Sequence, residues 1–265
     1  MISVKSTLTY RALAIFFHGT KDFLINIGNV GKDFVNVSRY ILKLRINIKA
    51  AIEQASRFAA DSLPITLTIV SMTSIIIAMQ IAPELAKQGA EGYIGMLSAL
   101  VMVRELACIM SGFAIISMIG SSFASELASM AVSEQINAMK VLKVDPIEYL
   151  VVPRFLAGVV MMPFVFILAS FAGLVCAGYV SKFTADLSLL NYVNSLWQGL
   201  YIRDILIALL KAAFFGGTIA LISCSSGYST RGGAKEVGIA TTRAVVWSFL
   251  AIAVWDYIFA AIFYL

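Results

Sequence analysis

The sequence predicts an all-α integral membrane protein, in which an N-terminal amphipathic interfacial helix precedes five transmembrane helices. Of the 265 residues, 60% are hydrophobic and 13% are charged, whereas soluble domains are about half apolar and about one quarter charged. Five apolar stretches are also long enough for a bilayer core, which needs about 20 residues. We place these spans near Ser62–Pro83, Gly92–Ser121, Tyr149–Val180, Ile205–Gly227 and Ala244–Leu265.

The N-terminal arm, residues 1–61, is more polar than the transmembrane domain predicted for residues 62–265. Between Phe16 and Lys43, polar residues recur every three or four positions, which is the period of an amphipathic helix. Its lysines and arginines suit an anionic lipid surface, so we favour an interfacial helix. The alternative is a cytosolic helix packed on the bundle. The arm lacks the compact apolar core and cleavage site of a signal peptide.

Lysine and arginine are unevenly distributed between the two sides of the membrane. The arm holds nine of them. Five spans would place two further basic segments on the same side, with Lys140, Lys143, Arg231, Lys235 and Arg243. The opposite side would receive Lys87, Lys182 and Arg203. Because cytoplasmic loops are rich in these residues, we expect a cytoplasmic N-terminus and a periplasmic C-terminus.

Local signals define one helix start and two sites of close helix packing. The segment Asp145–Glu148 offers an N-cap, a proline at the first helical position and an acidic residue at the third. The third span should therefore begin sharply. The pairs Gly173/Ala177 and Gly216/Ala220 put small residues four positions apart, which allows two helices to approach closely.

Four ionisable residues fall inside the predicted spans. They are Arg104 and Glu105 in the second span, Lys211 in the fourth and Asp256 in the fifth. A charge at a helix centre costs roughly 2.5–3.5 kcal/mol on insertion scales, so each residue needs a partner or a function. In one interpretation they pair, for instance Lys211 with Asp256, and hold the bundle together. In the other, which we favour, they line a polar cavity or gate. The two interpretations are compatible.

The residues do not favour an enzyme, a metalloprotein or a nucleic-acid-binding protein. The only histidine, His18, lies in the arm, so no Ser-His or metal-His constellation can form within the spans. The glycine-rich segment 227–232 faintly resembles a phosphate-binding loop, but Gly233 occupies the position of the required lysine. This chain is therefore not expected to be an ATPase. No basic patch alternates with exposed aromatic residues.

Several motifs together resemble the MlaE/YrbE family, the permease subunits of MCE-associated ABC transporters. They include Arg104-Glu105-Leu106, Ser133-Glu134-Gln135 and Val144-Asp145-Pro146. The similarity continues through all five predicted spans, whereas the N-terminal arm matches only in character. The spacing of the Glu-Gln and Asp-Pro pairs makes this resemblance specific.

The resemblance implies a homodimeric permease with the MlaE-type fold in the bacterial inner membrane. It would move phospholipids between the inner and outer membranes and so maintain the lipid asymmetry of the outer membrane. A cytoplasmic ABC ATPase would bind ATP and magnesium, so no cofactor is expected in this chain. A periplasmic MCE-domain protein would carry lipid onward, and some members have a STAS-domain subunit.

The resemblance also implies roles for particular residues. A coupling helix at about residues 123–143 would contact the ATPase, with Glu126, Glu134, Gln135 and Met139 at or near the contact. Among the intramembrane charges, Glu105, Lys211 and Asp256 fall on charged positions of the family and Arg104 lies beside them, which favours a lipid cavity or gate.

The chain departs from the family pattern at three places in or after the second span. Ala107-Cys108 replaces a Gly-Pro pair, so we expect a straighter and less broken span. Met118 and Ala131 occupy the positions of two family arginines, which leaves the details of coupling and headgroup preference open. Two other functions are also considered, a proton-coupled secondary transporter that uses Glu105 and Asp256 and a non-transporting membrane scaffold.

Overall fold

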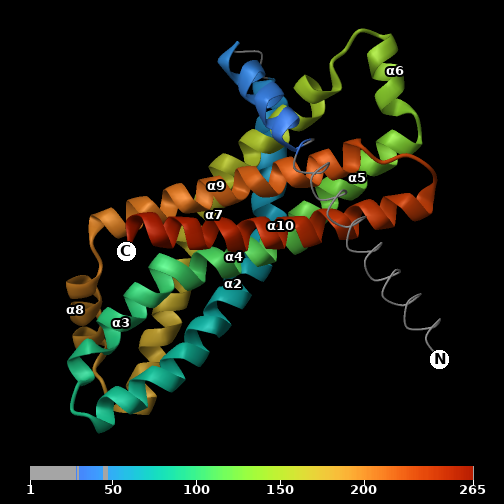
Figure 1. The fold of residues 1–265 in the computed structure, drawn as a ribbon. Coiled ribbons are helices and arrows are strands. Elements are labelled where there is room, and N and C mark those ends of the chain that lie inside the picture. The colour runs from blue at the N-terminus through green and yellow to red at the C-terminus, as the bar shows by residue number, and fades with distance from the viewer. Residues whose placement is uncertain (1–27, 29, 44–46, 265) are drawn as a thin grey trace, which may run out of the picture.

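The computed structural model describes residue 28 and residues 30–43 and 47–264. This part of the chain contains helices and no strand. Five helical segments are long and apolar enough to cross a membrane, which confirms the predicted fold class (Figure 1). They are Ile48–Lys87, Glu91–Val132, Ile147–Ala185, Ile202–Tyr228 and Ala234–Phe263.

Some spans are divided into shorter elements. The first, fourth and fifth spans are α2 (Ile48–Lys87), α9 (Ile202–Tyr228) and α10 (Ala234–Phe263). The second consists of η1 (Glu91–Tyr93), α3 (Ile94–Val101), η2 (Met102–Leu106), α4 (Ala107–Ile115), η3 (Ile116–Gly120) and α5 (Ser121–Val132). The third consists of η4 (Ile147–Val151) and α7 (Val152–Ala185), and two short helices, α6 (Gln135–Val141) and α8 (Leu189–Gly199), lie between spans.

The first spanning helix begins well before the predicted first span. α2 starts at Ile48 rather than Ser62, so it crosses the expected boundary between the arm and the transmembrane domain. The Asn47 side chain caps it by accepting a hydrogen bond from the Ala50 N–H at 3.1 Å. Hydropathy locates the part of a helix that suits lipid, whereas backbone hydrogen bonding continues as long as the residues favour a helix.

The second span is continuous but not regular. Its hydrogen-bond register shifts at the two π-helical segments η2 and η3, and η2 comes immediately before Ala107-Cys108. The expectation that loss of the Gly-Pro pair gives a less broken span is therefore only partly correct. The helix is not interrupted, but a π-helical turn alters its register at the charged Arg104-Glu105 pair.

Glycines set the closest helix contacts in the bundle. A Cβ atom added at Gly216 of α9 would lie 2.1 Å from the carbonyl oxygen of Gly158 on α7. A Cβ atom at Gly173 of α7 would lie 3.3 Å from the Cβ atom of Ser74 on α2. Both predicted small-residue pairs thus include a glycine at a close helix contact, and these contacts lie within one chain.

The third span starts as its sequence predicts. One Asp145 carboxylate oxygen, Oδ1, accepts a hydrogen bond from the Ile147 N–H at 2.9 Å. The Asp145 carbonyl also accepts from the Tyr149 N–H at 3.1 Å. Asp145 therefore satisfies backbone donors at the helix start, which is the role of an N-cap.

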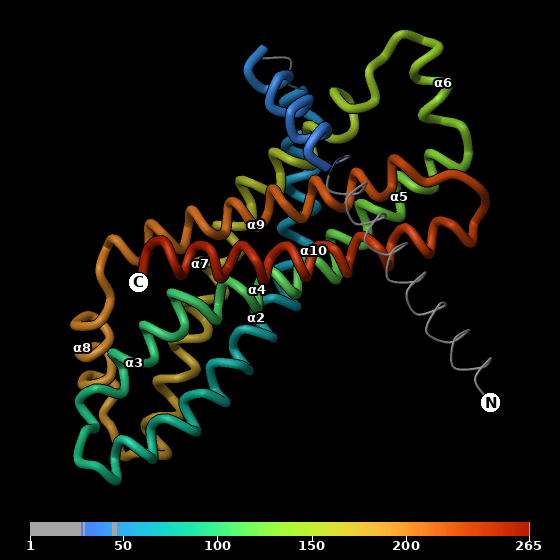
Figure 2. The backbone as a smooth tube through the Cα atoms, viewed as in Figure 1, coloured from blue at the N-terminus to red at the C-terminus, as the bar shows by residue number. Residues whose placement is uncertain are grey.

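The loops gather at two opposite ends of the bundle. At the α6 end, Lys140 lies over the Tyr228 ring at 5.2 Å, which places α6 beside the end of α9. At the α8 end, the Arg203 guanidinium donates to the Phe263 carbonyl at 3.5 Å, beside the end of α10. Figure 2 follows the backbone from α5 out through α6 and back into α7. The two basic loops predicted to share one side both lie at the α6 end.

The predicted amphipathic helix, residues 16–43, lies partly outside the described residues, because residues 1–27 and 29 are not among them. Residues 30–42 are helical. Val37 is buried in the core, and the Tyr40 hydroxyl donates to Asp145 at the α6 end. Phe34 and Leu42 remain exposed. The described part of this helix thus packs on the bundle and also presents apolar side chains outward.

Candidate functional site

Three of the four predicted intramembrane charges form one cluster around Lys211. Its Nζ atom donates to Glu105 Oε2 at 2.7 Å and lies 2.5 Å from Asp256 Oδ1, so the predicted pairing with Asp256 is confirmed. Nζ also donates to the Arg104 carbonyl at 3.2 Å, in the π-helical segment η2. The cluster therefore joins the second, fourth and fifth spans through one ammonium group.

Burial differs strongly among these three side chains. The Lys211 side chain is 0% exposed, whereas that of Glu105 is 35% exposed. An unpaired ammonium in such a place would be very costly, so its two carboxylate partners are needed to keep it charged. The partly exposed Glu105 carboxylate leaves the cluster open on one side. The arrangement thus provides both a cross-link between helices and a polar surface within the spanning region.

The fourth charge, Arg104, belongs to a separate ion pair. Its Nη2 atom donates to Asp204 Oδ2 at 3.1 Å, and its guanidinium lies 4.9 Å from the centre of the Tyr264 ring. Asp204 is buried at the start of α9, where its Oδ2 atom also accepts from the Tyr201 N–H at 3.4 Å. Sequence reasoning missed Asp204, because it lies just before the predicted fourth span. An acidic residue in the first turn of a helix is the signal that could have found it.

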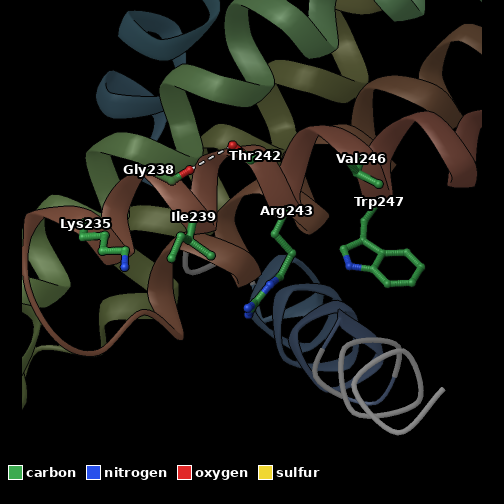
Figure 3. A pocket seen from close by; sticks show the side chains of 7 residues that line it. All are labelled: Lys235, Gly238, Ile239, Thr242, Arg243, Val246 and Trp247. Atoms are coloured by element: carbon green, nitrogen blue, oxygen red, sulfur yellow. Dashed lines mark hydrogen bonds between the residues drawn. The ribbon is translucent and has the colours of Figure 1, made fainter. Parts of the chain in front are cut away.

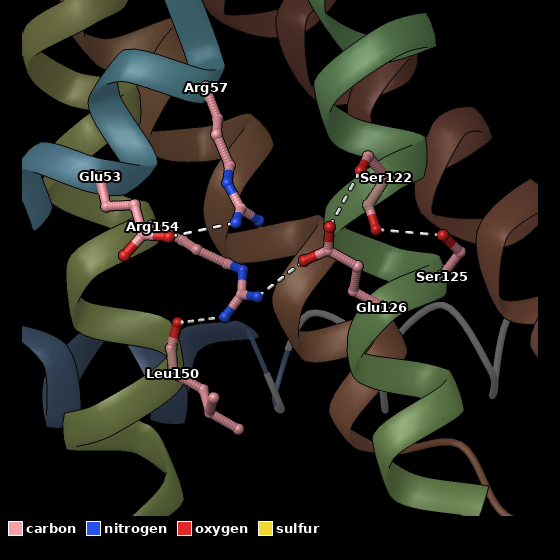
Figure 4. A network of polar contacts seen from close by, with 7 residues as sticks. All are labelled: Glu53, Arg57, Ser122, Ser125, Glu126, Leu150 and Arg154. Atoms are coloured by element: carbon pink, nitrogen blue, oxygen red, sulfur yellow. Dashed lines mark hydrogen bonds and ion pairs between the residues drawn. The ribbon is translucent and has the colours of Figure 1, made fainter. Parts of the chain in front are cut away.

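Glu126 lies away from this cluster and pairs within the chain. Its Oε2 atom accepts from Arg154 Nη2 of α7 at 2.8 Å, and Arg154 Nη1 donates to the Leu150 carbonyl at 2.8 Å (Figure 4). The Arg154 guanidinium also lies 5.5 Å from the centre of the Phe123 ring. Figure 4 draws this pair beside the exposed Glu53–Arg57 ion pair of α2. Glu126 therefore connects α5 to α7.

The segment predicted as one coupling helix is divided in the structure. α5 ends at Val132, and Glu134 adopts a left-handed conformation with φ 62° before α6 begins at Gln135. This backbone conformation cannot continue a right-handed helix, so only the short α6 forms a separate element. Gln135 Nε2 donates to the Ser133 hydroxyl at 3.0 Å, and Glu134 accepts from the Asn137 amide.

The tip of α6 carries exposed apolar side chains that sequence reasoning did not identify. Val141 and Leu142 are 82% and 74% exposed. By contrast, the predicted contact residue Met139 packs against the main hydrophobic core. Figure 1 shows α6 standing away from the other helices, above α5 and the right-hand ends of α9 and α10. A projecting helix with an exposed apolar tip is typical of a surface that binds a partner.

A shallow groove runs along α10, away from the charge cluster. Figure 3 shows the side chains that line it, which are Lys235, Gly238, Ile239, Thr242, Arg243, Val246 and Trp247. All of them belong to α10. Only 17% of an 18-residue apolar stretch of this span is buried, whereas 61% of the corresponding stretch of the fourth span is buried. Much of α10 therefore remains uncovered by the described chain.

The fold and the ion cluster define a multi-pass helical membrane protein with charged groups inside its spanning region. Comparison with known proteins gives the family. The family model of the MlaE permease matches residues 51–262, which is most of the chain. The chain belongs to the MlaE permease family, as its motifs predict, and is a transport subunit and not a catalyst.

Individual relatives agree with this assignment. A probable ABC transporter permease of Synechocystis is 37% identical over 80% of this chain and 81% of its own length. One of Rickettsia prowazekii is 33% identical over 87% of this chain and 89% of its own length. The chloroplast protein TRIGALACTOSYLDIACYLGLYCEROL 1 of Arabidopsis thaliana is 34% identical over 84% of this chain, which spans 64% of that protein.

Proposed function

We propose that this chain is the permease subunit of an ABC transporter that moves phospholipids between the inner and outer membranes and so maintains outer-membrane lipid asymmetry. It resides in the bacterial inner membrane as a homodimer, with a cytoplasmic N-terminus and a periplasmic C-terminus. A separate ATPase binds ATP and magnesium at the cytoplasmic face. A periplasmic MCE-domain protein carries the lipid onward, and a STAS-domain subunit can join the ATPase.

The observation that carries the proposal is the half-open ion cluster of Glu105, Lys211 and Asp256. A lipid headgroup needs polar partners at a depth where the surroundings are apolar, and Glu105 offers a partly exposed carboxylate there. Arg104 lies next to it on η2, with its guanidinium held by Asp204. The name of the Arabidopsis relative refers to a glycerolipid, which supports a lipid cargo.

Two surfaces support the proposed partners. The exposed tip of α6, at Val141 and Leu142, suits an apolar pocket on the ATPase, with Glu134 and Gln135 at the base of the same projection. The groove along α10 suits a second copy of the chain, because the described residues cover little of the fifth span. The proposal therefore assigns the ATPase to the α6 end and the dimer contact to α10.

Lipid transfer in the reconstituted transporter tests the role of the cluster. Glu105→Ala, Lys211→Ala and Asp256→Ala should each reduce transfer, because each removes a member of the polar surface. Leu210→Ala is a matched control, since Leu210 is the exposed neighbour of Lys211 on α9. Melting temperature in detergent identifies variants that fail only because they are unstable. Full transfer by all three folded variants would refute the proposed site.

The two carboxylates that share one ammonium also favour a second candidate, a secondary transporter in which Glu105 and Asp256 relay protons. Such a transporter would continue to work without the ATPase and would stop when the proton gradient is dissipated. The proposed ABC transporter should show the opposite behaviour in vesicles. An intact complex that transfers no lipid in either condition would instead indicate a membrane scaffold.

A further inference from the structure

The short helix α8 carries three distinct stripes of side chains. Successive residues on a helix are turned by about 100°, so residues three and seven positions apart lie on one face. Counted in this way, α8 has a buried stripe, an exposed apolar stripe and an exposed amide stripe. Their first residues are consecutive in the sequence. In that order, the stripes are Tyr192, Ser195 and Gly199; Leu190, Val193 and Trp197; and Asn191, Asn194 and Gln198.

The buried stripe fixes α8 firmly against the bundle. The Ser195 hydroxyl donates to the Gly92 carbonyl at 2.5 Å and accepts from the Met96 N–H at 3.1 Å. The Tyr192 hydroxyl donates to the Leu174 carbonyl of α7 at 3.2 Å. Glycine at position 95 lets the α8 backbone approach closely, since a Cβ atom there would lie 2.3 Å from the Tyr192 carbonyl oxygen. The orientation of the two exposed stripes is therefore set by tertiary contacts.

The apolar stripe continues the outward-facing surface of the neighbouring spans. Trp197 is 67% exposed, and Leu190 and Val193 are exposed beside it on the same face. Phe183, near the end of α7, and Ile202, at the start of α9, are exposed as well. Only short segments join α8 to these two spans, as Figure 1 shows. The helix must therefore remain close to the ends of these two spans.

The amide stripe lies about 100° around the helix from the apolar stripe and about 100° from the buried stripe. It is uncharged. None of the eleven residues of α8 is charged, and the exposed polar side chains are all carboxamides. A helix that attracts anionic headgroups needs lysine or arginine on its polar face. Tryptophan next to a neutral polar edge is instead typical of the boundary between acyl chains and headgroups.

We propose that α8 lies in the headgroup region of the leaflet at the α8 end. Leu190, Val193 and Trp197 insert among the upper acyl chains, while Asn191, Asn194 and Gln198 face headgroups and water. The occupant of this surface is thus the lipid bilayer. The helix holds by apolar insertion, so its binding does not depend on anionic lipid. This inference requires only that the chain spans a membrane and goes beyond the proposed transport function.

Nitroxide labels at adjacent positions of the two exposed stripes test the proposal. Val193→Cys and Asn194→Cys form one matched pair, and Leu190→Cys and Asn191→Cys form a second. Each is made in the full chain with Cys108, Cys176 and Cys224 replaced by alanine and reconstituted as the assembled transporter in phosphatidylcholine vesicles. The measurement is spectral relaxation by oxygen, which concentrates in lipid, and by a nickel chelate, which remains in water.

The ratio of oxygen to nickel accessibility should be higher at residues 190 and 193 than at 191 and 194. It should not change when phosphatidylglycerol replaces part of the phosphatidylcholine. Equal ratios within both pairs, or labels at 190 and 193 that neither reagent reaches, would overturn the proposal, because the second result indicates a protein partner. All four positions are exposed, and an unchanged melting temperature verifies that each labelled chain is folded.

Discussion

At the scale of single residues, Lys211 shows how the interior of the bundle stabilises a fully buried ammonium group. Two carboxylates and one backbone carbonyl surround Nζ. The carbonyl belongs to Arg104 in a π-helical turn, where the altered register changes which backbone groups are paired within the helix. The charge therefore depends on three helices that are distant in sequence, and its loss should affect the bundle as a whole.

Lys211→Met should destabilise the protein by about 3–5 kcal/mol, because it leaves two carboxylates without their cation. Thermal unfolding in detergent would measure the loss. Adding Glu105→Gln and Asp256→Asn to the same chain should recover most of the stability, since no unpaired charge then remains. A triple variant no more stable than Lys211→Met would contradict this account.

The Glu126–Arg154 pair should respond unequally to the loss of its two members. The Arg154 side chain is 8% exposed and that of Glu126 is 42% exposed. Glu126→Ala leaves a buried guanidinium unpaired and should cost roughly 1–3 kcal/mol. Arg154→Met leaves a carboxylate that water can reach and should cost less. Equal losses of stability in the two variants would show that the unequal burial of Arg154 and Glu126 does not determine the cost of removing each side chain.

At the scale of elements, the crossing of α7 and α9 depends on two glycines whose backbones touch. The sequence indicated Gly216 from its four-residue spacing with Ala220, but it did not indicate Gly158 as the partner. The partner is fixed by the angle and register at which the helices cross, which depend on packing along their whole length.

Gly216→Ala should destabilise the protein by about 1–3 kcal/mol or more, because the new methyl group would overlap the Gly158 carbonyl on a rigid backbone. Gly217→Ala is the matched control on the same helix. There the methyl group would meet only side-chain atoms of Phe155 and Val159 at 3.0 Å, which can shift. Melting temperatures that fall equally in both variants would contradict a backbone clash at Gly216.

The helix at residues 30–42 is expected to loosen as the pH rises. Burial raises the pKa of Asp33 above its usual value of 3.8, although a hydrogen bond with Ser225 opposes the shift. The folded state then favours the neutral acid, so the stability from this group is complete below pH 3.8 and is lost as pH rises through the raised pKa. Once the pH exceeds this raised pKa, the carboxylate is charged in a partly buried place.

Asp33→Asn should therefore slow hydrogen exchange in residues 30–42 at neutral pH, because it removes the buried charge and keeps a polar partner for Ser225. The difference from the parent chain should shrink as the pH approaches 4. Exchange measured by mass spectrometry at several pH values would check this. Identical exchange in both chains at neutral pH would rule out a destabilising role for the charge.

At the scale of the whole molecule, the bundle places different kinds of surface at its two ends. The ion cluster lies within the spans. Figure 1 shows α6 at one end of the bundle and α8, which carries no charged residue, at the other. Lysines and arginines are more frequent near the α6 end, so that end is expected to face the cytoplasm. The alternation of five spans then determines the side of every loop.

Cysteine labelling would test this orientation. In a chain whose three cysteines are replaced by alanine, Arg231→Cys should be protected from a membrane-impermeant maleimide in right-side-out vesicles, whereas Lys182→Cys should react. Both side chains are exposed, and they lie near opposite ends of the bundle. Inverted vesicles should reverse the result. Labelling only of Arg231→Cys in right-side-out vesicles would reverse the proposed topology.

The sequence by itself determined the class of the protein, the number of spans, the start of the third span and the intramembrane charges. These properties are local, because hydropathy and helix caps depend on neighbours within a few turns. The family motifs also lie in continuous stretches of the chain, so the permease assignment did not require coordinates.

Only the tertiary structure decided which charges pair and which surfaces stay open. It assigned Asp204 to Arg104, joined Glu126 to Arg154, divided the predicted coupling helix at Glu134 and turned one edge of α8 outward. The ion pairs and the orientation of α8 depend on contacts between segments far apart in sequence. The break at Glu134 depends on a left-handed backbone conformation that a non-glycine residue seldom adopts.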